Sequence, residues 1–390
     1  MKIIEIGTGY TSIPAKMGAA TEIVVEELTK AFVSLGKNVE LVDISDNNRL
    51  SNQLPITEVK IPQFFSSTDV KLGIVHKLKR VIYSIALAKK LNKIIKNEND
   101  EVLLHFHNQY NLYFFLKLLN KSIKNKVKIA YTVHSYIWAG EWEDIKSIVK
   151  KRYFQEICCV RNADYVLVLN DITKDHFTKH FGINETNIFK VINGVNTKTY
   201  HQLTAGEIDS QKTELGLESK HIIFQVGSVC DRKNQLGAVK MLCEYLKKHK
   251  DTIYMYAGGI IDPDYQQEII NYSKSNNIHE QVIYVGELCP GYQLNKYYNI
   301  ADFTIFPSRL ESFGLVIIES LSAGTPVLLL ETPIFDLNSG YRVFESESEL
   351  YSILDEKAMN NKDFIPNIEK YSWESVARDH IGLFESKGDN

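Results

Sequence analysis

Two glutamates in the second half of the 390-residue chain are spaced so that they could flank a bound anion. A buried strand is expected to end at Phe306, a turn follows, and a helix is expected to begin near Phe313. Free backbone N–H groups and the positive end of that helix would lie beside a glycine, where a diphosphate could approach closely. Glu311 lies on the turn and Glu319 inside the helix, so their carboxylates would lie on either side of the anion.

The two carboxylates suit different parts of a ligand. Glu319 could accept hydrogen bonds from paired ribose hydroxyls, as acidic residues do in dinucleotide-binding folds. Glu311, at the mouth of the turn, suits a polar group beyond the phosphates. An isolated glutamate is more often a solvent-exposed turn residue or an ion-pair partner on a helix, but the surrounding residues favour the binding roles.

Arg232 and Lys233 form a second candidate site, on a turn that leads from an expected strand into a helix. Arginine can hold two phosphate oxygens and lysine acts as a point charge, so the pair could stabilise a leaving diphosphate. An ordinary exposed Arg-Lys pair is disfavoured here, because cations at a helix N-terminus oppose the helix dipole.

The first half of the chain offers weaker signals. Gly7 and Gly9 follow the first expected strand, but Ser12 stands where a G-x-G-x-x-G fingerprint requires its third glycine, so no dinucleotide loop is predicted. His134 ends a strand at the carboxyl edge of a sheet, where ligands bind in open α/β folds. Alone, such a histidine would more often be structural.

No metal site is predicted. His105 and His107 end the preceding strand and could line a binding site or form a metal pair, but no carboxylate with ligand spacing accompanies them. Asp262 and Asp264 superficially offer an Asp-x-Asp metal motif, yet Asp264 is more simply interpreted as the N-cap of the following helix.

Short β-branched runs alternate with segments of helical period along almost the whole chain, which is typical of parallel sheets covered by helices on both faces. The series restarts near residue 221 after a polar linker, 196–220, so we expect an α/β protein with two Rossmann-like units. The expected strands are Ile3–Ile6, Val39–Val42, Val102–His105, Lys128–Val133, Tyr165–Leu169, Phe189–Ile192, His221–Val226, Ile253–Ala257, Val282–Val285, Phe303–Phe306 and Val327–Leu330.

The composition is that of a folded globular protein, with 44% hydrophobic and 24% charged residues. The net charge is −3, but residues 1–200 carry 28 Lys and Arg against 20 Asp and Glu. Within them, 77–96 interleaves basic and apolar residues, as in a helix that touches an anionic membrane or in an ordinary exposed helix with a core-facing stripe. Five cysteines without CxxC spacing favour a reducing cytosol, and no apolar segment is long enough to span a membrane.

The string Glu311-Ser312-Phe313-Gly314-Leu315, with Glu319 and the later Ala323-Gly324-Thr325-Pro326-Val327, resembles the family 4 glycosyltransferases. These are retaining enzymes of GT-B fold, in which two Rossmann-like domains with parallel sheets face each other across a cleft. Ser312 stands where glycine is usual. The resemblance implies that Glu311 meets the hydroxyls of the donor sugar and that Glu319 binds the ribose. The implied contacts to diphosphate and sugar come from Ser312, Phe313, Gly314 and Leu315.

Other segments resemble the same family. Residues 18–22 resemble its Gly-Gly-Thr-Glu loop, with Ala19 and Ala20 in place of both glycines and Gly18 just before them. His134 matches a histidine near the transferred sugar, and Ser228 replaces the first arginine of the family pattern, which leaves the later cation pair. The remaining implied donor contacts are Gly227, Arg232, Lys233, Gly259, Glu287 and Leu288.

The resemblance implies a retaining glycosyltransferase that moves a sugar from a nucleoside diphosphate sugar, with a UDP-sugar favoured, to a sugar, lipid-linked or protein acceptor in glycan synthesis. Neither a cofactor, a metal nor a nucleic acid is expected, and the expected location is the cytoplasm or the inner face of the membrane. A silent nucleotide-sugar-binding protein and an NAD-dependent oxidoreductase are the alternatives. The implied catalytic residues are Glu311, His134, Arg232 and Lys233, and the expected domains are 1–200, 201–370 and a returning helix within 371–390.

Overall fold

The computed structural model describes residues 1–390 except 16–19, 51, 63–73, 331–339, 357–367 and 387–390. It divides the chain into two compact units, Met1–Gly194 with Trp373–Asn390, and Val195–Ser372. The sequence analysis placed these boundaries at residues 200 and 370, slightly inside the second unit. The Val195 amide donates to the Tyr371 carbonyl at 2.7 Å, which ties both crossing segments to that unit.

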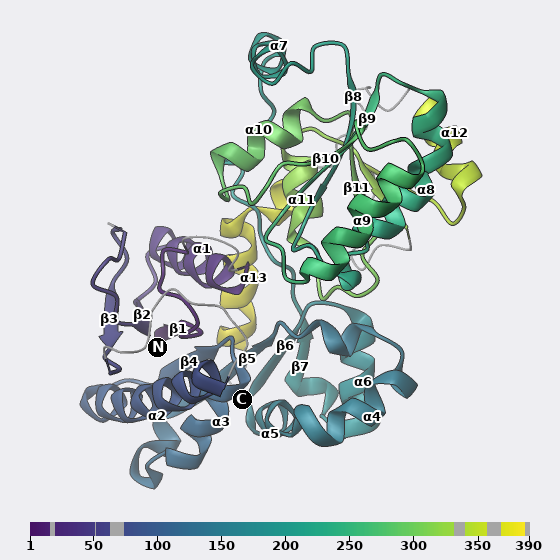
Figure 1. Cartoon of the computed structure of the whole chain (residues 1–390). Helices are drawn as coiled ribbons and strands as arrows, with labels where there is room; N and C mark the ends of the chain where they lie inside the picture. The colour runs from purple at the N-terminus through teal and green to yellow at the C-terminus, as the bar shows by residue number, and fades with distance from the viewer. Residues whose placement is uncertain (16–19, 51, 63–73, 331–339, 357–367, 387–390) are drawn as a thin grey trace. The chain divides into compact units, whose positions relative to one another are not determined.

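The described residues of the first unit form a seven-stranded parallel sheet in the order β3-β2-β1-β4-β5-β6-β7 (Figure 1). Its central strands are buried along nearly their whole length, because a parallel sheet covered on both faces requires apolar side chains on both. The strands are β1 (Lys2–Ile6), β2 (Val39–Ile44), β3 (Ile56–Val59), β4 (Val102–Phe106), β5 (Val127–Val133), β6 (Tyr165–Val168) and β7 (Ile188–Lys190).

Helices connect these strands and cover the sheet. The last helix of the chain, α13 (Trp373–Ser386), packs against α1, as the yellow helix in Figure 1 shows. Its buried residues recur at helical spacing, which confirms the helix expected from Ser372 onward. The other helices are α1 (Ala20–Ser34), α2 (Ile74–Asn97), α3 (Gln109–Leu118), α4 (Trp142–Arg152), α5 (Phe154–Asn162) and α6 (Asp171–Phe181).

The described residues of the second unit form a six-stranded parallel sheet in the order β10-β9-β8-β11-β12-β13. The strands are β8 (His221–Val226), β9 (Thr252–Ala257), β10 (Val282–Tyr284), β11 (Phe303–Phe306), β12 (Val327–Leu329) and β13 (Tyr341–Val343). The helices are α7 (Ala205–Glu214), α8 (Gln235–Lys248), α9 (Pro263–Ser275), α10 (Tyr292–Ile300), α11 (Leu315–Ser322) and α12 (Glu347–Asp355).

Each sheet has a point where the strand order reverses. In the first unit β2 and β3 are added on one side of β1, and β4 then pairs with the other side of β1. In the second unit β9 and β10 are added on one side of β8, and β11 pairs with its other side. At such a point the loops that follow the two adjacent strands run away from each other and leave a crevice at the carboxyl ends of the strands. This crevice is the usual ligand site of an open α/β sheet.

The structure confirms each expected strand, with no end displaced by more than two residues. The sequence analysis missed β3 and β13. Both are short edge strands, and an edge strand needs apolar side chains on fewer of its positions than a central strand does.

Gly194 is the last residue of the first unit before the chain enters the second unit, and Trp373 is the first residue after the chain returns. The two residues are in close contact. A Cβ at Gly194 would lie 2.5 Å from Trp373 Cδ2, whereas a Cβ at Gly206 in α7 would meet nothing within 4 Å. We expect Gly194→Ala to destabilise the first unit by about 1–3 kcal/mol through overpacking. Gly206→Ala should be neutral or stabilising by up to about 1 kcal/mol. Urea unfolding curves for the two variants compare these effects, and equal midpoints would contradict the expectation.

Candidate active site

Two loops at the switch point of the second sheet carry the predicted cations and Glu311. Because β8 pairs with β11, the segments 227–234 and 307–314 leave the sheet side by side. The Arg309 amide donates to the Arg232 carbonyl at 3.0 Å, and Asn234 Nδ2 donates to the Pro307 carbonyl at 3.1 Å. These bonds hold the two loops together although Asn234 and Pro307 are 73 residues apart in sequence.

Glu311 lies between the two predicted cations. Its Oε1 accepts from Arg232 Nη1 at 2.6 Å and from Lys233 Nζ at 2.6 Å. The glutamate side chain is 11% exposed and that of Lys233 12%, so this cluster is largely shielded from water. Burial lowers the pKa of Lys233, and the attraction of Glu311 partly offsets that shift. Two cations against one carboxylate leave positive charge available to a further anion.

Gly227 makes room for Lys233. A Cβ at Gly227, whose φ is 151°, would lie 3.1 Å from both Cδ and Cε of the Lys233 side chain. Asn234 adopts a left-handed conformation between the short 3₁₀ turn Asp231–Lys233 and helix α8. The cations therefore lie on the turn immediately before the helix, as the sequence pattern predicted.

Helix α11 begins at Leu315, directly after Gly314, as expected. Gly314 has φ 86° and occupies the N-cap position of α11. Because glycine has no side chain, the helix start has no side-chain cap, and the Ile317 amide donates to the Gly314 carbonyl at 3.0 Å. A Cβ at Gly314 would lie 3.1 Å from Phe306 Cζ, and its positive φ would strain any other residue. Phe313 is buried with 1% exposure, so its ring packs in the interior of the unit.

Glu319 projects from α11 and accepts a hydrogen bond from the Tyr298 hydroxyl at 3.0 Å. Burial raises the pKa of Glu319 to about 7, and hydrogen bonds from Tyr298 and Tyr200 oppose that rise. The sequence analysis did not identify these two tyrosines, because α10 and the linker reach Glu319 only in the folded unit. A carboxylate held by hydroxyl donors can accept further hydroxyls, which fits a ribose.

Comparison with known proteins identifies the family. Residues 207–336 match the family model "Glycosyl transferases group 1", and residues 21–199 match "Glycosyltransferase Family 4". The chain belongs to the group 1 glycosyltransferases. It is 24% identical over 254 residues to the alpha-galactosylglucosyldiacylglycerol synthase of Streptococcus pneumoniae, a match that covers 62% of this chain and 66% of the relative. The first three curated relatives are matched over only 54–66% of their own length.

Solved structures show the fold of this glycosyltransferase. Sucrose-phosphate synthase from Thermosynechococcus elongatus superposes with a TM-score of 0.75 at 17% identity, over 100% of this chain and 99% of that one. Anabaena HepE in complex with UDP and glucose gives 0.70 at 14% identity, over 99% and 100%. These likenesses confirm the GT-B fold class that the family resemblance implied.

The other predicted donor contacts of the glycosyltransferase lie on neighbouring loops of the same sheet edge. A Cβ at Gly259, after β9, would lie 3.4 Å from the Glu287 carboxylate, so these two positions are adjacent. Leu288 follows on that loop and is half-buried, and Ser312 precedes Phe313 on the β11 loop. Gly18 and Ala19 lie outside the described residues.

The structure corrects two expectations about metal-ligand patterns. Asp262 caps α9 by accepting from the Asp264 and Tyr265 amides at 3.1 Å, so Asp262 and not Asp264 is the N-cap. Pro263 occupies the first helical position, where its missing N–H costs nothing.

The second correction concerns His105 and His107. The sequence analysis found no carboxylate to accompany them, but the pairing of β1 with β4 places Glu5 against both, at 2.8 Å and 2.9 Å. His107 Nδ1 in turn lies 3.0 Å from His134 Nε2. No local signal could have revealed Glu5, since about 100 residues separate it from these histidines.

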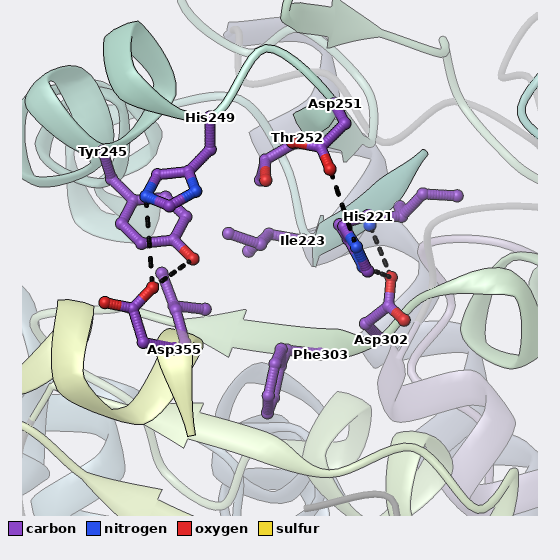
Figure 2. A pocket seen from close by; sticks show the side chains of 11 residues that line it. His221, Ile223, Tyr245, His249, Asp251, Thr252, Asp302, Phe303 and Asp355 are labelled. Carbon is purple, nitrogen blue, oxygen red and sulfur yellow. Dashed lines mark hydrogen bonds and ion pairs between the residues drawn. The ribbon is translucent and has the colours of Figure 1, made fainter. Parts of the chain in front are cut away.

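A separate cavity of about 300 Å³ lies at the opposite edge of the second sheet. Figure 2 shows it between His221, Thr252 and Phe303, which begin β8, β9 and β11. Ionisable side chains in its lining pair with one another; for example, His249 Nε2 lies 4.0 Å from Asp355 Oδ1. Ligands of open α/β sheets bind at the carboxyl ends of the strands, so this cavity is not the candidate donor site.

The pKa of Glu319 predicts how nucleotide binding depends on pH. With a pKa of about 7, Glu319 carries a proton below that pH in the free protein, whereas we expect ribose hydroxyls to bind the ionised carboxylate. Binding must then release that proton, so the dissociation constant should rise by up to about tenfold per pH unit below about 7. Calorimetric titration with a nucleoside diphosphate measures this dependence.

Two variants separate Glu319 from the titration of the phosphate itself. Glu319→Gln should bind the nucleoside diphosphate more weakly and lose the extra pH dependence. Tyr298→Phe should raise the pH at which binding weakens, because one hydrogen-bond donor to the Glu319 carboxylate is removed. Parallel pH curves for wild type and Glu319→Gln would show that Glu319 does not meet the nucleoside.

Proposed function

We propose that this glycosyltransferase moves a sugar from a nucleoside diphosphate sugar, with a UDP-sugar favoured, to an acceptor hydroxyl with retention of anomeric configuration. The observation that carries the proposal is the meeting of Arg232, Lys233 and Glu311 beside the glycine-capped start of α11. The two cations and the helix N-terminus suit a diphosphate. The structurally similar HepE is solved with UDP and with UDP-glucose, whereas the similar starch synthase IV of Arabidopsis thaliana is bound to ADP. We favour uridine and include ADP among the nucleotides to be tested.

The proposed reaction needs no nucleophile from the protein. The bond between the anomeric carbon and the diphosphate oxygen breaks, the acceptor oxygen bonds to that carbon from the same face, and the acceptor proton passes to the departing phosphate oxygen. Arg232, Lys233 and the N–H groups of α11 stabilise the developing charge. A bound diphosphate would draw the two cations from Glu311, and the freed carboxylate would accept hydrogen bonds from hydroxyls of the donor sugar.

We expect the acceptor to be a lipid-linked or surface glycan. The similarity to a pneumococcal diacylglycerol glycosyltransferase supports this class. None of the described helices could cross a membrane. Helix α2, however, exposes Val75 by 61% and Leu78 by 53% beside the exposed Lys77, which suits contact with an anionic bilayer.

Calorimetry with UDP, GDP, ADP and NAD tests the donor site. We expect one diphosphate to bind with a dissociation constant near micromolar, about −8 kcal/mol. Arg232→Ala should weaken that binding about 10- to 100-fold, because a hydrogen bond to a charged group contributes about 1.5–3 kcal/mol. Glu311→Ala should keep nucleotide binding and lose sugar transfer.

Arg309→Ala is the matched control for these variants, since Arg309 lies on the same loop with its side chain 59% exposed and paired with Asp231. It should bind and react like wild type. Binding of NAD alone would overturn the proposed donor class, and full activity of Glu311→Ala would remove its role at the sugar.

Flotation with anionic liposomes tests the membrane contact. Wild type should float at low salt, and Val75→Ser with Leu78→Ser should reduce the bound fraction severalfold because both apolar contacts are lost. Leu215→Ser removes a leucine of similar exposure, 42%, from the second unit and should float like wild type. Equal flotation of all three proteins would place the membrane contact elsewhere.

A further inference from the structure

A buried polar network lies behind His134 in the first unit. Glu5 on β1 is fully buried, and its two carboxylate oxygens face two imidazoles: Oε1 lies 2.8 Å from His105 Nδ1, and Oε2 lies 2.9 Å from His107 Nε2. His107 continues the chain of hydrogen bonds to His134 Nε2 at 3.0 Å. Sheet pairing of β1, β4 and β5 brings these groups together from three segments.

The charge state of Glu5 sets the direction of the first bond. Burial alone would raise the pKa of Glu5, but the attraction and hydrogen bonds of His105 and His107 outweigh it and lower the pKa to about 2. Burial lowers the pKa of His107 to about 4. At neutral pH the carboxylate can therefore only accept, and the neutral His107 must carry its single proton on Nε2.

The direction of the second bond follows from the first. With its proton on Nε2, His107 has a lone pair at Nδ1 and can only accept there. His134 must then donate from Nε2, which leaves the lone pair of His134 at Nδ1. Within the described part of the chain, no other group hydrogen-bonds to a nitrogen of the His134 ring, and the side chain is half-buried at the carboxyl end of β5.

We infer that Glu5 and His107 are positioning residues that hold His134 in the Nε2–H tautomer, so that its Nδ1 lone pair accepts a hydrogen bond from a sugar hydroxyl. This inference rests on the proposed function for the identity of the substrate, but the tautomer itself does not depend on it. A histidine without this support would be free to present either a donor or an acceptor.

The other arm of the network serves as an internal comparison. His105 Nε2 lies 2.7 Å from the Thr132 hydroxyl, which can donate or accept, so this arm ends inside the protein. His380 of α13 covers it with ring centroids 5.9 Å apart, and its own Nδ1 lies 2.8 Å from the Val376 carbonyl. Both Glu5 oxygens and both nitrogens of His105 and His107 have partners, so the arrangement is that of a completed hydrogen-bond network.

The direct test is a long-range proton–nitrogen NMR spectrum of the full chain with isotope-labelled histidine, with His134 assigned by comparison with His134→Gln. We expect His107 and His134 both to carry their protons on Nε2. A proton on Nδ1 of His134 in the wild-type protein would overturn the inference, even if the variants below fail to fold.

Glu5→Gln tests the coupling. An amide can accept from only one of the two imidazoles and must donate to the other, so His105 or His107 must reverse its tautomer. Where His107 reverses, His134 should reverse with it. In that case kcat should fall about 10- to 100-fold, the usual effect of removing the group that orients a histidine, while KM for the donor changes less. Reversal of His107 without reversal of His134 would contradict the coupling.

Thr132→Val is the matched control, because it also removes one buried hydrogen bond but on the His105 arm. It should leave the His134 tautomer unchanged and kcat within about twofold. A merely structural network would instead lower activity in both variants in step with thermal stability. If the tautomers are as expected but the wild-type protein transfers no sugar, the proposed function is wrong and the inference about the network is retained. If sugar is transferred while His134 is in the other tautomer, only the inference is wrong.

Discussion

The meeting of one carboxylate with two cations holds the candidate site in shape. Arg232 and Lys233 both donate to the same oxygen of Glu311, in a place where each of these side chains has lost most of its contact with water. Removing a charge from water costs free energy unless the charge is paired. If either loop moved away, the charges on the other loop would therefore lose their partners. The loops after β8 and β11 are thereby held at a fixed distance from each other.

The glycines around this cluster follow from the same close approach. Gly227 leaves space for the lysine side chain, and a Cβ at Gly258 would lie 2.1 Å from the Gly227 carbonyl oxygen. Gly314 adopts a left-handed backbone conformation that starts α11 without a side-chain cap, and its carbonyl accepts from the Ile317 amide. Loops that converge at the carboxyl edge of a parallel sheet have little room for side chains, which favours glycine at these positions.

The two units use their sheet edges in different ways. In the second, two cations pair with one carboxylate in a place that is largely shielded from water. In the first, Glu5 is fully buried and its hydrogen bonds run outward through His107 to His134. A buried carboxylate satisfied by imidazoles imposes a fixed direction on each hydrogen bond, so it defines which atom the outermost histidine presents.

The sequence by itself determined the alternation of strands and helices, the glycine before α11 and the cations after β8, because these depend on local periodicity and on residues a few positions apart. It also pointed to Glu311 and Glu319 as a pair. Only the tertiary structure decided that Tyr298 donates to Glu319, that Glu311 faces both cations, and that Glu5 lies against two histidines about 100 residues away. These contacts arise from which strands pair in each sheet, and strand order is set by packing of the whole unit, which no local pattern of residues encodes.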